Sequence, residues 1–191
     1  MNIKIIQIPK NDLKDFYRIY KDYTNGKMSL ASLKRKYREF PNLFLGAYLE
    51  NKLIGIVFGL PSRNNKKEII LHSIAVLAQY WRKGIGSKLL KRFFRECKKR
   101  GFSEISVATG EGVERFYLKN EFKVRYPRVE LDYKHENLFK KKFKESISKK
   151  VKRRTYVIFY LRVKDFDNKL RNKIKNKFGV QEVIFILERK L

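Results

Sequence analysis

Apolar and polar residues at the start of the chain recur with periods typical of a mixed α/β protein. Residues 2–8 alternate with a period of two, which predicts a half-buried strand. Two stretches with apolar residues at helical spacing follow. The first is predicted to be capped by Asn11 or Asp12, and the second is predicted to be capped by Ser29 and stopped by Pro41.

The pattern then changes to strands separated by short turns. Residues 43–49 and 52–60 predict two strands joined in a hairpin at Glu50-Asn51, and an apolar run predicts a strand over 68–76. Similar signals predict the remaining elements of the first 133 residues: a helix over 86–100 ended by Gly101, a strand over 104–108, a helix containing Phe116 and Tyr117, and a final hairpin over 123–133 broken at Pro127.

Residues 68–90 carry the strongest chemical signal in the chain. The strand ends in a polar loop containing Gly84 and Gly86, and an amphipathic helix follows at once. The first N–H groups of a helix lack partners within it and carry partial positive charge, so such a junction binds anions. Glycines let the backbone come close to a bulky anion, where a Cβ would clash. The loop is therefore predicted to hold a phosphate or pyrophosphate.

Two nucleotide-binding motifs are excluded, and a third pattern fits. No Gly-Lys-Ser or Gly-Lys-Thr occurs, and Leu89 stands where the dinucleotide fingerprint needs its third glycine. The segment resembles the acyl-CoA loop of the GCN5-related N-acetyltransferase (GNAT) superfamily, with Trp81 in place of the usual Arg or Gln. The matching residues are Ile74-Ala75-Val76 at the strand end and Arg82-Lys83-Gly84-Ile85-Gly86 at the helix start.

A second element, residues 114–122, is similar to the family pattern x-x-F-Y-x-K-x-G-F. Glu121 replaces the usual glycine, so Asn120 is predicted to take the left-handed backbone position at the helix exit. The resemblance covers residues 1–133. It implies the α/β (α+β) acyl-CoA N-acyltransferase fold, a mixed and mostly antiparallel central sheet flanked by helices, and it implies acetyl-CoA as co-substrate.

The resemblance also implies which residues bind the donor. The strand end pairs with the pantetheine arm in this family, and the loop amides hold the pyrophosphate. The corresponding residues here are Ile74, Ala75, Val76, Arg82, Lys83, Gly84, Ile85, Gly86 and Ser87. The side chains of Arg82 and Lys83 equally fit a solvated surface.

Three residues are candidates for proton transfer. Tyr117 matches the family tyrosine that protonates the CoA thiolate, and a phenol pKa near 10 keeps it protonated at neutral pH. Glu68 and His72 are both candidates for the general base, and alternation places His72 on the same strand face as Ile70 and Ile74. Each role has an alternative. Tyr117 also fits a core aromatic residue, His72 also fits a core histidine, and backbone carbonyls with ordered water could replace both candidate bases. No metal is expected.

Composition and the lengths of the apolar runs argue against membrane, secreted and cysteine-rich classes of protein. No apolar run approaches the ~20 residues that span a bilayer, and residues 1–10 are too short and too polar for a signal peptide. The single Cys97 excludes an internal disulfide and a cysteine metal cluster, and its place on an apolar stripe predicts a small buried hydrophobe. We therefore expect a cytoplasmic protein without a membrane partner.

Residues 134–191 are predicted to form a basic C-terminal α-β-α-β annex to a main domain over 1–133. They carry 19 Lys and Arg against 6 Asp and Glu, a net +13 of the total +28. The predicted elements are a helix with the stripe Leu138, Phe139, Phe143, Ile147 and Val151, a strand over 155–163, a helix capped by Asp165 and ended by Gly179, and a strand over 180–188. A short β-α-β unit favours parallel pairing. Docking on the main domain and docking on a second subunit of a homodimer are both left open.

Two functions follow from these features. The first is acetyl-CoA-dependent transfer of an acetyl group to a primary amine. The basic surface disfavours cationic acceptors and favours an acidic peptide or an amine carried on a ribosome or RNA, and the acceptor itself is not identified. The alternative is nucleic-acid binding through the annex, where aromatic residues accompany the basic runs 140–144 and 149–154. A solvated helix face also explains those runs.

Overall fold

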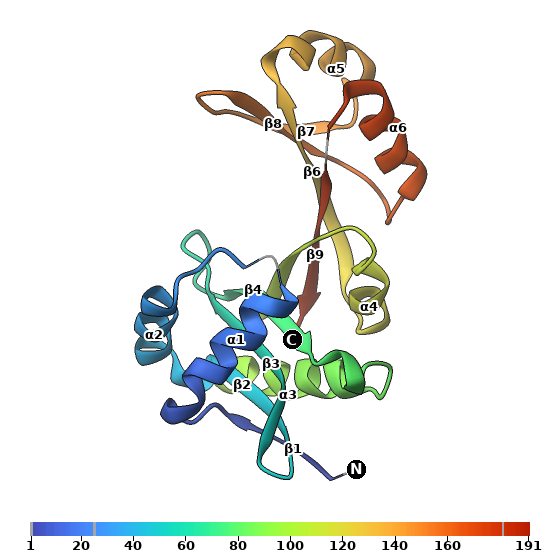
Figure 1. The fold of residues 1–191 in the computed structure, drawn as a ribbon. Coiled ribbons are helices and arrows are strands. Elements are labelled where there is room, and N and C mark those ends of the chain that lie inside the picture. Colours follow the sequence, from blue (N-terminus) through green and yellow to red (C-terminus); the bar gives the residue numbers. More distant parts are fainter. Residues whose placement is uncertain (1, 25, 181) are drawn as a thin grey trace. The chain divides into compact units, whose positions relative to one another are not determined.

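The structure is a computed structural model that describes residues 2–24, 26–180 and 182–191 (Figure 1). It divides into two compact units. The first runs to Ile105 and includes Lys190 and Leu191, and the second runs from Ser106 to Arg189. The division falls within strand β5 (Glu104–Thr109).

The first unit is an antiparallel sheet with helices on both faces. Its strands, in the order β1-β2-β3-β4, are β1 (Ile3–Gln7), β2 (Phe44–Leu49), β3 (Lys52–Pro61) and β4 (Glu68–Val76). Its helices are α1 (Leu13–Tyr23), α2 (Leu30–Glu39) and α3 (Ile85–Lys99). The predicted hairpin turn is confirmed, since Glu50 and Asn51 both have left-handed backbones.

The two faces of this sheet are covered by different helices. Phe16 of α1 lies 5.5 Å from the ring of Phe44 and 5.7 Å from that of Phe58, within a core that α2 also joins. Gly59 follows Phe58 along β3 and therefore faces the opposite way, where Phe93 of α3 lies so close that a Cβ at Gly59 would meet its ring at 2.9 Å. The sheet is thus buried on both faces, which explains its nearly continuous apolar strands.

The second unit has the chain order β-α-β-β-α-β after a short first helix. Its elements are α4 (Glu114–Lys119), β6 (Lys123–Asp132), α5 (Glu136–Phe143), β7 (Ile147–Lys152), β8 (Tyr156–Leu161), α6 (Asn168–Phe178) and β9 (Val183–Lys190). The strands are ordered β9-β6-β8-β7. Phe139 of α5 packs 4.7 Å from Phe159 of β8 and 5.1 Å from Phe178 of α6, so both helices cover the same face (Figure 1).

The predicted final hairpin over 123–133 is wrong, because β6 is one continuous strand. Its hairpin partner is β9, and Pro127 lies opposite Phe185 in that pairing. The pairing with β8 begins only at Arg128, so Pro127 has a strand on one side, where a missing N–H is tolerated. Residues 133–182 are therefore an insertion between the two strands of the hairpin, and the predicted boundary at 133/134 runs through one group of paired strands.

The predicted helix that was to carry Ile147 and Val151 also ends earlier. α5 stops at Phe143, and both residues lie in β7. A spacing of four places residues on one side of a helix and equally on one face of a strand, so this stripe fits both periods. The predicted pairing of the two strands in the β-α-β unit is wrong as well. β8 and β9 run in the same direction, but they do not pair with each other, because β6 lies between them and pairs antiparallel with both.

Helix caps were predicted with mixed accuracy. Ser29 accepts a hydrogen bond from the amide of Ser32, as expected for an N-cap. Asp167, rather than Asp165, caps α6 by accepting from the amides of Lys169 and Leu170. No helix within the described ranges is both long enough and apolar enough to cross a membrane.

Candidate active site

The loop after β4 and the start of α3 form an exposed backbone turn. Gly84 caps the helix with a left-handed φ of 75°, and Arg82 is also left-handed at 60°. Lys88 donates to the carbonyl of Gly84 at 3.1 Å, so the amides of the preceding helical residues have no i−4 partner within α3. A Cβ at Gly84 would meet nothing within 4 Å, which leaves open space for an anion over this turn.

Trp81 fastens this loop to the strand before it, a contact that nothing in the sequence pattern indicated. Its indole N–H donates to the carbonyl of Val76 at 2.5 Å, while the side chain stays 59% exposed. The loop is further fixed by the amide of Leu77, which donates to the carbonyl of Ile54 at 2.9 Å. The Lys83 ammonium lies 5.6 Å from the ring of Tyr80. The loop is thus held in shape although Arg82, Lys83 and Gly84 are exposed.

The predicted donor residues at the end of β4 lie on both faces of the strand. Ala75 is buried in the core beneath α1 and α2. Ile74 and Val76 are half-buried and pair with Val57 and Gly55. Together with the loop they form a continuous segment in the first unit, and their contact with a donor stays a prediction.

A β-bulge changes the geometry predicted for His72. Ser73 pairs with Phe58 and Leu71 pairs with Gly59, so His72 is an extra residue between them. Strict alternation fails here, because the bulge turns Ile70 and Ile74 toward opposite faces. The interpretation that placed all three side chains on one face is therefore wrong.

The two candidate bases differ in exposure. The ring of His72 stacks on Phe58 with centroids 5.6 Å apart and planes 9° apart, and the side chain keeps solvent access. Partial burial lowers the pKa of His72 below 6.5, and Lys36 adds to this effect, so the imidazole is neutral at pH 7. Glu68 is buried, with only 7% of its surface exposed.

Tyr117 lies in helix α4 of the second unit and is buried. Its ring makes edge-to-face contacts with Phe116 at 5.2 Å and Phe122 at 5.4 Å. Burial raises the pKa of Tyr117 above its ordinary value, so the phenol stays protonated at neutral pH. The structure thus describes Tyr117 in one unit and the donor segment, Glu68 and His72 in the other.

The exit from α4 differs from the prediction. Asn120 keeps a negative φ of −101°, and Glu121 itself takes the left-handed conformation at 67°. The carbonyl of Asn120 accepts from Arg189 at 2.7 Å, and the carboxylate of Glu121 pairs with the same guanidinium at 2.5 Å. The turn needs positive φ at the position where the family has glycine, and Glu121 adopts it there.

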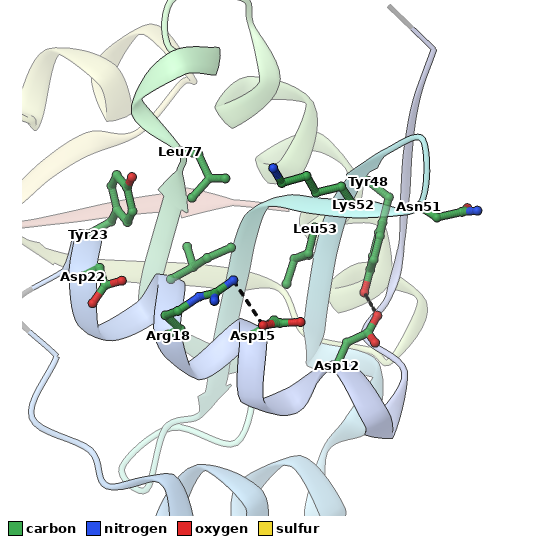
Figure 2. Close-up of a pocket in the computed structure, with 11 residues that line it drawn as sticks. Asp12, Asp15, Arg18, Asp22, Tyr23, Tyr48, Asn51, Lys52, Leu53 and Leu77 are labelled. Carbon is green, nitrogen blue, oxygen red and sulfur yellow. Dashed lines mark hydrogen bonds and ion pairs between the residues drawn. The ribbon is translucent and has the colours of Figure 1, made fainter.

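A pocket of about 300 Å³ lies along α1 in the first unit (Figure 2). Its lining is rich in aspartates, and its residues are Asp12, Asp15, Arg18, Ile19, Asp22, Tyr23, Tyr48, Asn51, Lys52, Leu53 and Leu77. Asp12 accepts from the Tyr48 hydroxyl at 2.6 Å, and Asp15 pairs with Arg18 at 3.2 Å. None of the predicted site residues lines it, although Leu77 directly follows Val76.

No group of three or more His, Cys, Asp or Glu within the described ranges is arranged to hold a metal ion. Cys97 is fully buried, as predicted, and burial raises the pKa of its thiol to about 12. It is therefore an inert core residue at neutral pH.

The family model for acetyltransferases of the GNAT family matches residues 10–122. The chain belongs to the GNAT acetyltransferase family. Both the family and the fold class predicted from the sequence are thereby confirmed, and this GNAT chain is an acyltransferase. No curated protein matches its sequence.

Solved structures share the fold of this GNAT chain at low sequence identity. Ard1 from Thermoplasma volcanium has a TM-score of 0.66 at 15% identity, with 100% of this chain and 99% of that chain covered. The ribosomal-protein-S18-alanine N-acetyltransferase from Escherichia coli has 0.62 at 15%, with 99% and 94% covered. Arabidopsis thaliana Naa50 in complex with the bisubstrate analogue CoA-Ac-MVNAL has 0.61 at 12%, with 100% of both chains covered.

Proposed function

We propose that the chain transfers an acetyl group from acetyl-CoA to a primary amine by direct attack. The observation that carries this proposal is the exposed turn at the start of α3, where Gly84 leaves open space beside amides that have no helical partner. The match to the GNAT family model supports it, because that match includes the whole turn.

Acetyl-CoA fits the residues of this segment. The amides of residues 82–87 would hold the pyrophosphate, and the exposed side chains of Arg82 and Lys83 would add positive charge. The half-buried Ile74 and Val76 would lie against the pantetheine arm. Naa50, which shares the fold, binds an analogue that contains CoA.

The reaction needs alignment and two proton transfers. The amine nitrogen attacks the thioester carbonyl carbon, the carbon–sulfur bond breaks, and an amide and a CoA thiolate form. A base takes the proton that the amine loses, and Tyr117 gives its phenolic proton to the thiolate. The raised pKa of Tyr117 supports its role as the proton donor, because the phenol is protonated before the reaction.

His72 is the better supported base. It is exposed and neutral at pH 7, whereas only 7% of the surface of Glu68 is exposed. The bulge supports this choice because it sets His72 apart from the regular strand pairing. Bulges often re-aim a side chain next to an active site.

For the acceptor we propose a protein or peptide amine in the cytoplasm. Two proteins that share the fold support this choice: the Escherichia coli enzyme is named as a ribosomal-protein-S18-alanine N-acetyltransferase, and Naa50 binds the bisubstrate analogue CoA-Ac-MVNAL. The net charge of +28 disfavours small polycations and favours acidic peptides. Mass spectrometry of peptides with acidic and basic residues after a free N-terminus would test this, and acetylation of polyamines alone would contradict it.

Calorimetry with acetyl-CoA tests the donor site, and α3 supplies a matched control. Gly84 and Gly101 flank this helix, have φ of 75° and 76°, and each have nothing within 4 Å of a Cβ. Alanine at either position strains the backbone by about 1–2 kcal/mol. We expect Gly84→Ala to weaken acetyl-CoA binding about tenfold and Gly101→Ala to leave it unchanged. Absence of acetyl-CoA binding to the wild-type chain at about 1 mM would contradict the proposal.

A further inference from the structure

Within the described residues of the second unit, α5 and α6 cover one face of the sheet, and the other face carries no helix of that unit. Val129 and Phe159 point toward α5 and α6 and are fully buried. Their neighbours along β6 and β8 alternate to the other face, where Ile158 is buried but Tyr126, Arg128 and Tyr160 are only half-buried. We call this surface the tyrosine face and define it by Tyr126 and Arg128 of β6, Tyr160 of β8 and Lys149 of β7, which are three adjacent strands.

Two tyrosines occupy the middle of this face. Tyr126 of β6 and Tyr160 of β8 make an edge-to-face contact with ring centroids 5.3 Å apart. Arg128 pairs with Tyr160 across the same two strands. These are the two central strands of the order β9-β6-β8-β7, so both rings lie away from the sheet edges.

Positive charge surrounds the two rings. The Lys149 ammonium lies 5.8 Å from the ring of Tyr160, and the Arg125 guanidinium lies 5.8 Å from the ring of Tyr126. No acidic residue occurs from 147 to 164, a segment with seven basic ones: Lys149, Lys150, Lys152, Arg153, Arg154, Arg162 and Lys164.

Carboxylates on this face do not remove that charge. Glu130 lies 2.9 Å from Arg128 and Glu188 lies 3.2 Å from Arg125, so each is matched by a cation beside it. The field around Lys149 and Tyr160 therefore stays positive. An anion with flat aromatic groups is the complementary partner.

We propose that the tyrosine face binds single-stranded nucleic acid. Unpaired bases stack on aromatic side chains presented by the central strands of a four-stranded sheet, and phosphates contact the surrounding Lys and Arg. A duplex hides the faces of its bases and cannot use the rings. The proposal does not depend on the acetyltransferase reaction.

This surface differs from the basic helix that the sequence pointed to. In α5, Lys140 is engaged with Glu136 at 2.6 Å, and Lys150 of β7 reaches the same carboxylate at 3.1 Å. α5 also packs on the opposite face of the sheet from Tyr160. We therefore expect nucleic acid to contact the tyrosines of the sheet instead of the lysines of α5.

Fluorescence anisotropy with labelled 12-nucleotide strands tests the proposal on the full chain. We expect single-stranded RNA to bind more tightly than a duplex of the same sequence. Tyr160→Leu should weaken binding about tenfold, the loss of one base stack, while Tyr160→Phe should bind within about twofold of wild type. Equal binding of DNA strands supports the same surface, because stacking does not read the sugar.

Salt titrations separate this face from general attraction to a basic protein. Lys149→Gln should reduce the slope of log K against log salt by about 0.7, one phosphate contact on a single strand. Lys141→Gln is the matched control, because Lys141 is an exposed lysine of α5. Equal effects of the two lysines, unchanged binding by Tyr160→Leu, or tighter binding of duplex or poly-glutamate would overturn the proposal.

A photo-cross-linking measurement needs no variant and so does not depend on whether Tyr160→Leu folds. RNA carrying 4-thiouridine should cross-link to the tryptic peptide of residues 155–162, which contains Tyr156 and Tyr160. Cross-links confined to peptides of α5 and α6 would overturn the proposal.

Discussion

The ion pair between Arg171 and Glu114 offers a quantitative test of what stabilises the second unit. Their side chains are 1% and 2% exposed and are in direct contact, which joins α6 to α4. The guanidinium also lies 5.3 Å from the ring of Phe166 and 4.9 Å from that of Phe185. The Glu114 carboxylate accepts from the amide of Gly112 at 2.9 Å.

Breaking this pair from one side should be far more damaging than replacing it. Glu114→Ala leaves a buried, unpaired guanidinium, and Arg171→Met leaves a buried, unpaired carboxylate, so each should lower the free energy of unfolding by about 3–5 kcal/mol. The double variant Glu114→Leu with Arg171→Met removes both desolvation costs and keeps apolar volume between the rings. We expect it to unfold within about 1–2 kcal/mol of wild type.

Hydrogen exchange of backbone amides in β8 and α6 would measure these changes within the second unit. Trp81, the only tryptophan of the chain, lies in the first unit, so its fluorescence during urea unfolding is an internal control. We expect the exchange to accelerate in both single variants while the Trp81 transition changes little. Single variants that lose less than about 1 kcal/mol, or a double variant as unstable as the sum of the two, would refute this account of the pair.

Three further predictions concern single side chains. Lys140, followed by Lys150, lowers the pKa of Glu136 to about 2, so this carboxylate stabilises the fold above about pH 4.5 and loses that effect as the pH falls toward 2; acid unfolding of Glu136→Gln should lack this component. Tyr117→Phe should lower kcat for acetyl transfer about 100-fold at unchanged acetyl-CoA affinity, and an unchanged kcat would exclude Tyr117 as the proton donor. Glu121→Gly should raise the melting temperature by relieving a left-handed backbone worth about 1 kcal/mol, and a lower melting temperature would show that its ion pair is the larger effect.

Local signals in the sequence predicted the first unit closely. The strand over 68–76 has the predicted bounds, and α3 begins one residue before its predicted start. Glu50-Asn51 forms the predicted turn, and Gly101 ends α3 in a left-handed conformation. These features depend on residues within a few positions of each other, so the pattern of a short window is sufficient.

The same local signals could not predict which strands pair when they are far apart in the sequence. The partner of β6 is β9, which is separated from it by residues 133–182, and no local pattern marks that choice. The proline at 127 suggested a break, but a break is needed only where strands pair on both sides. The bulge at His72 also depends on its neighbour, because it arises from the register against Phe58 and Gly59.

In the candidate site, too, the sequence predicted local features but not those that depend on tertiary packing. The loop with Gly84 was found from its own residues, because a helix start and a glycine are local features. The sequence could not predict which candidate base is accessible, since the exposure of His72 and the burial of Glu68 follow from tertiary packing. The sequence could not predict the tyrosine face either, because it joins β6 to β8, a strand within the insertion that is far from β6 in sequence.

The insertion between β6 and β9 has a consequence for the order of synthesis. β6 leaves the ribosome many residues before β9, and β8 is translated in between and can cover one of its edges first. The other edge stays unpaired until β9 has been translated, and an unpaired edge is prone to aggregation. The hydroxyl of Thr109 likewise waits for its acceptor, the carbonyl of Phe185. Residues 1–133 carry the family's motifs, but a chain that stops there leaves β6 without either of its neighbouring strands.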